Sequence, residues 1–151
     1  MKKTIVTLLI AVLLIPLFVP QQAEASQKDS QIIMDAYNWV CEDVWNNYFC
    51  DMYHYIESGT GSLGQKLNAK KCIKNGKKVV KKVAYYDAQM KKLSNTKKNK
   101  KAKEIWKKLK KEIIMLDKQL QEKTPKANDE SYIFNTDKFQ TYMYKLLDYV
   151  Y

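Results

Sequence analysis

Six apolar residues recur at alternating steps of four and three in a segment that is otherwise dominated by lysine. They are Ala102, Trp106, Leu109, Ile113, Leu116 and Leu120. Because an α-helix has about 3.6 residues per turn, these steps place all of the side chains on one helix face. The spacing predicts a helix over about residues 99–122, which Thr124-Pro125 would end because proline cannot continue a helix.

Helical spacing recurs in three other segments, whereas the alternation typical of strands is missing. The first helix is expected over about residues 30–58, with a stripe of Met34, Tyr37, Cys41, Trp45, Tyr48, Met52 and Ile56. The second is expected over about residues 63–93, with Ser62 and Gln65 at the spacing of a capping box. The last is expected to begin near Thr136-Asp137. Whether the second helix breaks at Asn75-Gly76 stays open.

Short connections between these segments favour antiparallel neighbours. The sequence therefore predicts an all-α fold, namely a small antiparallel (up-down) helical bundle of about four helices. The 151 residues suit one domain, because single domains usually run to about 100–200 residues.

The first 25 residues have the pattern of a secretory signal peptide. Met1-Lys2-Lys3 is basic, residues 5–19 are mostly apolar, and Ala23-Glu24-Ala25 offers small residues at a cleavage site. The apolar run is shorter than the roughly 20 residues of a spanning helix. We expect cleavage after Ala25, a single helical domain over residues 26–151, and a secreted protein, either extracellular or associated with the cell wall.

Charge is concentrated in the middle of the chain. All 27 basic residues are lysine, and the net charge is +11. Residues 66–111 hold 19 lysines against Asp87 and Glu104, whereas residues 26–65 hold one lysine against six acids and residues 112–151 hold five against seven. This asymmetry indicates either a charged partner or internal pairing of the basic middle with the acidic ends.

Paired lysines at helical spacing predict one broad basic face that would bind anions. Its candidate residues are Lys70, Lys71, Lys77, Lys78, Lys81, Lys82, Lys107, Lys108, Lys110 and Lys111. The absence of arginine argues against bidentate recognition of phosphates or bases, so sequence-specific binding of nucleic acid is not expected. Binding should instead be diffuse and sensitive to salt. The expected partners are an anionic polymer of the cell envelope or an acidic protein, with peripheral membrane contact as a further candidate.

Three cysteines, Cys41, Cys50 and Cys72, would meet an oxidising environment if the protein is exported. Folding the first two predicted helices into a hairpin about Gly61 places Cys50 opposite Cys72, which predicts a disulfide between them. Cys41 is then either a buried free thiol or a residue that pairs between chains.

Two motifs suggest enzymatic chemistry but lack its context. Residues 59–64 match GxGxxG, yet a dinucleotide fingerprint needs a preceding strand, so we expect a loop between helices. Cys50, His54 and Glu57 share one helix face, whereas a nucleophile and its base usually come from separate elements around a cleft. One histidine and three cysteines at these spacings predict no metal site. No catalytic residue, no cofactor and no enzymatic activity are expected.

Aromatic residues are dense between Tyr37 and Tyr55. Most would fill the core, and Trp39 and Tyr53 are candidates for an exposed aromatic contact. The sequence favours a secreted, cationic, non-enzymatic binding protein. The alternatives left open are a membrane-active, toxin-like protein and a protective or inhibitory partner of a secreted toxin.

Overall fold

A computed structural model describes residues 19–150 of the chain. Helices are the only regular structure among these residues, so the predicted all-α class is confirmed. The predicted signal peptide lies mostly outside the described residues. The elements are α2 (Val19–Asn38), the π-helix η1 (Trp39–Phe49), α3 (Cys50–Ser58), α4 (Ala69–Val80), α5 (Val83–Lys91), α6 (Lys97–Glu122) and α7 (Asp137–Leu147).

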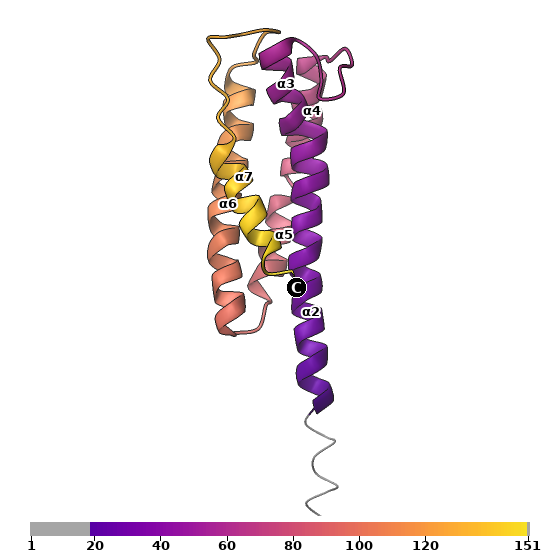
Figure 1. The fold of residues 1–151 in the computed structure, drawn as a ribbon, viewed down its shortest axis with the longest axis vertical. Coiled ribbons are helices and arrows are strands. Elements are labelled where there is room, and N and C mark those ends of the chain that lie inside the picture. Colours follow the sequence, from indigo (N-terminus) through magenta and orange to yellow (C-terminus); the bar gives the residue numbers. More distant parts are fainter. Residues whose placement is uncertain (1–18, 151) are drawn as a thin grey trace, which may run out of the picture.

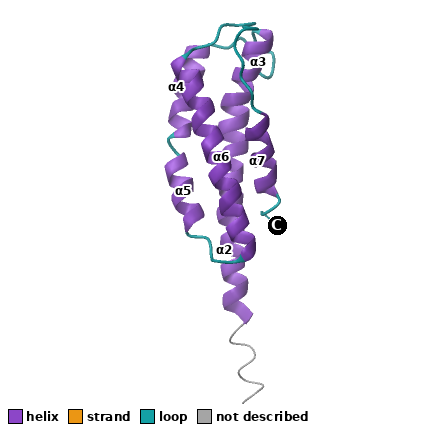
Figure 2. Cartoon of the chain, turned by 90° about the vertical axis from the view of Figure 1, so that its left-hand side faces the viewer, coloured by secondary structure: helices purple, strands orange, loops and turns teal. Residues whose placement is uncertain are grey.

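The helices lie side by side along the long axis of the molecule (Figure 1). α2, η1 and α3 follow one another without a break and form one long rod. α4 packs on η1 and α6, α5 packs on α2 and α6, and α7 packs on α6 and α2. The loops before α4 and before α7 lie at one end, and the α5–α6 connection lies toward the other (Figure 2).

The predicted helix over residues 99–122 is confirmed as α6, which begins two residues earlier. The Thr96 hydroxyl caps it by accepting the amide hydrogen of Asn99 at 3.1 Å. All six residues of the predicted stripe are at most 2 % exposed. α6 is therefore the central helix of the core, and its exposed positions carry most of its lysines.

Burial along the rod departs from the predicted stripe in its first half. The core takes Ile33, Ala36, Val40, Val44, Tyr48, Met52 and Ile56, whereas Met34, Tyr37, Cys41 and Trp45 are half-buried. Repeated steps of four residues would drift by about 40° per step around an α-helix. η1 has wider turns, as in the bond from the Cys50 amide to the Trp45 carbonyl five residues back, and these turns absorb the drift.

The second predicted helix is divided, but not at Asn75-Gly76. α4 continues through both residues, and a turn at Lys81 and Lys82 separates it from α5. Gly76 lies against the ring of Tyr48, and a Cβ atom at this position would come within 2.3 Å of ring carbons. Glycine is therefore needed here for the close approach of α4 to η1.

A buried hydrogen-bond network joins η1 to α6. The Tyr48 hydroxyl donates to one carboxylate oxygen of Asp117 at 3.0 Å, and the Gln121 amide donates to the other. Asp117 is 7 % exposed, and burial raises its pKa above the usual value despite these hydrogen bonds. Tyr48 therefore contacts α4 through its ring and α6 through its hydroxyl.

The Gly-rich segment forms the expected loop between α3 and α4, but its Ser62 and Gln65 do not form the predicted capping box. Both donate to Asp51 in α3, Ser62 through its amide at 2.9 Å and its hydroxyl at 2.6 Å, and Gln65 through its side chain at 3.2 Å. α4 begins later, capped by Asn68, whose side chain accepts the Lys71 amide hydrogen. The prediction failed because the carboxylate of Asp51, eleven residues away, accepts both donors.

At the opposite end, Asp29 anchors α2 to the α5–α6 connection. Its carboxylate accepts the amide and hydroxyl of Ser94 and the side-chain amide of Asn99, the last at 2.7 Å. Burial raises the pKa of Asp29, but these hydrogen bonds outweigh burial and hold it below its usual value. α2 is thereby held beside the connection that begins α6.

Candidate anion-binding surface

The lysines of α4 occupy the positions of this helix that do not face the core. Ala69, Ile73 and Gly76 are buried against the neighbouring helices. The exposed positions carry Lys70, Lys71, Lys74, Lys77, Lys78 and, just past the helix, Lys81. An ammonium group is almost never fully buried, so this pattern fixes which side of α4 faces water.

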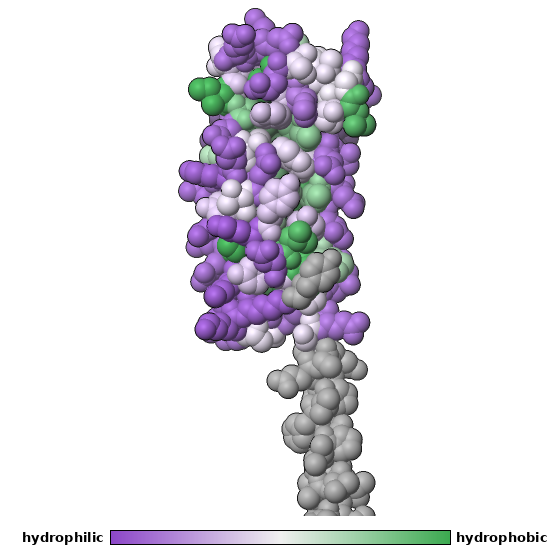
Figure 3. All heavy atoms as spheres, in the orientation of Figure 1, coloured by the Kyte–Doolittle hydropathy of each residue, from purple (hydrophilic) through white to green (hydrophobic). Residues whose placement is uncertain are grey.

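α6 carries further exposed lysines, and the face of the molecule in Figure 3 is mostly hydrophilic. Lys107 and Lys110 lie along the side of α6 that meets α5, where Lys110 pairs with Asp87. Lys107, Lys108 and Lys111 are exposed, while Lys110 is half-buried. Together with Glu104 and Ile114 they line a surface hollow of about 670 Å³. We call the ten lysines predicted above the lysine surface. The structure places them on α4, on α6 and on the turn after α4.

Acidic residues neutralise only a small part of the lysine surface. Lys82 pairs with Asp43 of η1 at 3.3 Å, and Lys110 pairs with Asp87 of α5 at 2.7 Å. The other members make no ion pair with any described residue: they are Lys70, Lys71, Lys77, Lys78, Lys81, Lys107, Lys108 and Lys111. Internal pairing with the acidic ends therefore does not account for the charge of this segment.

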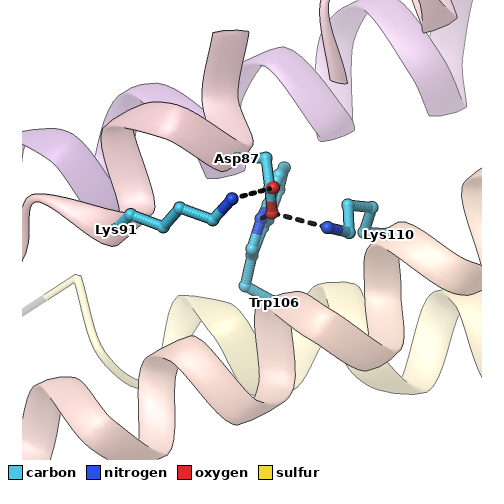
Figure 4. Close-up of polar contacts among 4 residues, drawn as sticks. All are labelled: Asp87, Lys91, Trp106 and Lys110. Carbon is cyan, nitrogen blue, oxygen red and sulfur yellow. Dashed lines mark hydrogen bonds and ion pairs between the residues drawn. The ribbon is translucent and has the colours of Figure 1, made fainter. Parts of the chain in front are cut away.

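Asp87 is the acidic centre of the packing between α5 and α6 (Figure 4). One of its oxygens accepts the indole N–H of Trp106 at 3.1 Å and the ammonium of Lys110, and the other pairs with Lys91 at 3.1 Å. The hydrogen bond from Lys110 is the main cause that lowers the pKa of Asp87 to about 2. The ammonium group of Lys110 is therefore paired within the protein, and the unpaired positive charge lies on the neighbouring lysines of α6.

Because of this contact, we expect the free energy of unfolding to depend on pH in the acidic range. Because the folded pKa of Asp87 is lowered, its contribution is present above the unfolded value near 3.8 and is lost as the pH falls toward 2. Asp87→Asn should therefore reduce the free energy of unfolding by about 1–2 kcal/mol at pH 7. Urea unfolding at pH 7 and pH 2.5 measures this.

The difference between wild type and Asp87→Asn should shrink at pH 2.5, since the wild-type carboxyl begins to gain its proton there. Asp148→Asn, which changes an exposed carboxylate after α7, serves as the control and should leave stability nearly unchanged at both values. A deficit for Asp87→Asn of equal size at both pH values would show that packing, not charge, holds this contact.

One of the two candidate aromatic contacts is wrong. Trp39 is only 4 % exposed: its ring stacks on Tyr86 at 4.6 Å and lies 6.4 Å from Trp106. Trp39 is the first residue of η1, whose wider turns shift the inward face of the rod by one residue. This shift brings Trp39 to the core side of the helix. Tyr53 is 38 % exposed, and its ring lies perpendicular to that of His54, so it remains accessible.

The predicted Cys50–Cys72 disulfide is also wrong, because Cys41, Cys50 and Cys72 are all free thiols. The contact of Tyr48 with Gly76 shifts α4 by two residues from the hairpin register that would pair the cysteines. A difference of two residues displaces α4 by about 3 Å along its axis, so the assumed pairing of Cys50 with Cys72 does not form. Burial raises the pKa of Cys72 to about 11 and also raises that of Cys50.

No hydrogen bond joins Cys50 to His54 among the described residues, and the raised pKa of Cys50 is the opposite of what an activated thiol needs. Within residues 26–150 no group of three or more histidine, cysteine or acidic side chains could hold a metal ion.

The periodicity gave no sign of the buried acids Asp29 and Asp117 or of the half-buried Asp87, because partners of these carboxylates come from other elements. It also missed Lys66 and Lys126, which line a cavity at the loop end. In the described part of the chain, no helix is long and apolar enough to cross a membrane. Comparisons with protein-family models, curated proteins and solved structures found no match to this chain, so its function is inferred from its own geometry.

Proposed function

We propose that this protein is a secreted, non-enzymatic binding protein whose lysine surface holds an anionic polymer of the cell envelope. The observation that carries the proposal is the set of eight lysines on α4, on the turn after it and on α6 that make no ion pair with any described residue. Concentrated like charge repels itself and adds nothing to folding stability. A polyanion that lies across these helices would relieve that repulsion.

A phosphate-bearing polymer suits the α4 part of this surface better than an acidic protein does. Protein interfaces usually have an apolar centre surrounded by a polar rim. On α4 the exposed positions between Lys70 and Lys81 hold only lysines and Asn75, with no large apolar side chain. Lysine is a compact point charge on a flexible stem, which fits a flexible chain of phosphates without fixed geometry.

The proposal includes an up-and-down antiparallel arrangement of about four helices, with the long rod of α2, η1 and α3 counted as one. It also includes export: cleavage after Ala25 would leave a single domain over residues 26–151 that begins three residues before the anchor at Asp29. Short connections such as residues 92–96 between α5 and α6 support the arrangement.

A binding titration with a poly(glycerol phosphate) chain tests the proposal. The test variant replaces Lys71, Lys78 and Lys111 with Gln, and the control replaces Lys28, Lys138 and Lys145 with Gln. All six lysines are exposed, so both variants lose the same charge with little effect on folding. At low salt the test variant should bind at least about tenfold more weakly than wild type, whereas the control should stay within about threefold.

Equal losses in the two variants would contradict the proposal, because binding would then follow net charge and not the lysine surface. Binding to uncharged dextran of similar length, measured in parallel, should be absent. Retention on dextran at the same strength would show that the phosphates are not what the protein recognises.

A further inference from the structure

A second basic feature lies at the end of the molecule where two loops meet (Figure 2). The amides of Asn128 and Asp129, in the loop after α6, donate to the carbonyls of Tyr55 and Ile56 in α3, at 3.3 and 3.0 Å. These bonds hold the α6–α7 loop against the end of α3. Beside them lies a cavity of about 620 Å³, lined by Tyr55, Lys66, Leu67, Asn68, Ala69, Lys70, Thr124, Pro125 and Lys126.

The cavity lining carries three cations and no carboxylate. The ammonium groups of Lys66, Lys70 and Lys126 make no ion pair or hydrogen bond with any described residue. Two carboxylates at this end have hydrogen-bond partners of their own: Asp51 of α3 accepts from Ser62, and Asp129 of the α6–α7 loop accepts from Ser131 at 2.6 Å. Three segments of the fold therefore bring unneutralised positive charge to one hollow.

The N-terminus of α4 is not the feature that carries this argument, because the Asn68 side chain caps it by accepting the Lys71 amide hydrogen. The lining also offers hydroxyl groups from Tyr55 and Thr124, which can donate to an anion. Three ammonium groups can balance a phosphate dianion, whereas one carboxylate would leave most of their charge unpaired. The volume exceeds that of a phosphate, which leaves room for the group that carries it.

We propose that this cavity is a discrete binding site for a phosphate monoester, which shares only Lys70 with the lysine surface. Two sources could supply such a group: a soluble or polymer-terminal phosphate, or the headgroup of an anionic lipid. Leu63 and Ile133 project from the same two loops with exposed fractions of 90 % and 80 %. Exposed apolar side chains beside lysines would suit contact with a lipid surface.

Glycerol phosphate is the probe for the site itself. Isothermal titration would compare wild type with Lys66→Gln/Lys126→Gln and with a matched control, Lys97→Gln/Lys100→Gln. The control removes the same charge from exposed positions at the other end of α6. Lys70 is left intact because it also belongs to the lysine surface. The cavity variant should bind glycerol phosphate about tenfold more weakly than wild type, and the control within about twofold.

Sedimentation with vesicles of phosphatidic acid and phosphatidylcholine identifies the source. If binding to these vesicles is lost in the cavity variant and competed by glycerol phosphate, the site takes a lipid headgroup. If the vesicles do not bind but glycerol phosphate does, the site takes a soluble or polymer-terminal phosphate, and the proposal stands in both cases. Absence of glycerol phosphate binding to wild type, or equal weakening in the cavity and control variants, overturns it.

The outcome is separable from that of the proposed function. The variant that tests the lysine surface leaves Lys66 and Lys126 unchanged, and the cavity variant leaves Lys71, Lys78 and Lys111 unchanged. If the protein binds poly(glycerol phosphate) but not glycerol phosphate, the proposed role of the lysine surface stands and the proposed phosphate site in the cavity is wrong.

Discussion

Gly76→Ala should lower the free energy of unfolding by about 2–3 kcal/mol, although alanine normally stabilises a helix interior relative to glycine by about 1 kcal/mol. The added Cβ would lie 2.3 Å from ring carbons of Tyr48. That ring cannot move aside easily, because it is fully buried and its hydroxyl is held by Asp117. Either α4 must shift away from η1 or the Tyr48 network must break.

Asn75→Ala is the matched control for this prediction. Asn75 is the preceding residue of the same helix and is exposed, so the change should be neutral or stabilising by about 0.5 kcal/mol. Chemical denaturation followed by circular dichroism measures both variants. A Gly76→Ala variant as stable as Asn75→Ala would show that α4 does not pack this closely on η1.

Asp117→Ala should cost about 2–4 kcal/mol, because it leaves the buried Tyr48 hydroxyl and the Gln121 amide without their acceptor. Asp117→Asn should lose far less, since its carbonyl oxygen can still accept the Tyr48 hydrogen. Burial raises the pKa of Asp117, so the folded protein pays for ionisation of this carboxyl as the pH rises above about 4. Removing that ionisation should favour the asparagine variant at pH 7.

A double-mutant cycle separates the hydrogen bond from other effects. Tyr48→Phe and Asp117→Leu remove the donor and the acceptor, and the double variant leaves neither partner unsatisfied. The double variant should therefore be more stable than the sum of the single losses predicts, by about 1–2 kcal/mol. Additive losses would contradict a direct interaction between the two side chains.

Helices whose burial follows ordinary α-helical spacing were predicted well from the sequence. α6 is the clearest case, because its stripe from Ala102 to Leu120 lies in one unbroken α-helix and is buried throughout. η1 was missed because a π-helix has no distinctive residue pattern here, and its wider turns exchange which residues face the core. The same cause made Trp39 look exposed.

Contacts between elements could not be predicted from spacing alone. The disulfide prediction depended on an assumed hairpin register, whereas the contact of Gly76 with Tyr48 corresponds to a register that differs by two residues, and the cysteines are free thiols. The division of the predicted second helix at Lys81 and Lys82 likewise has no glycine or proline to mark it. These features depend on how helices fit together in three dimensions.

The candidate surface was easier to predict than the core, because lysine must face water wherever the helix lies. Composition alone could not decide whether acidic residues of the chain neutralise these lysines or leave a basic surface without ion pairs. That decision needed the pairing of Lys82 with Asp43 and of Lys110 with Asp87, which consumes little of the charge. The loop-end cavity was missed because Lys66 and Lys126 are 60 residues apart in the sequence.

The salt dependence of poly(glycerol phosphate) binding tests the central claim most directly. A flexible polyanion releases counterions for each phosphate that a lysine neutralises, with a slope of about −0.7 per contact in a plot of log K against log salt. Four to eight contacts predict a slope of about −3 to −6 for wild type, and replacement of Lys71, Lys78 and Lys111 should reduce its size by about 2. A slope near zero, or one that the three substitutions leave unchanged, would contradict the account.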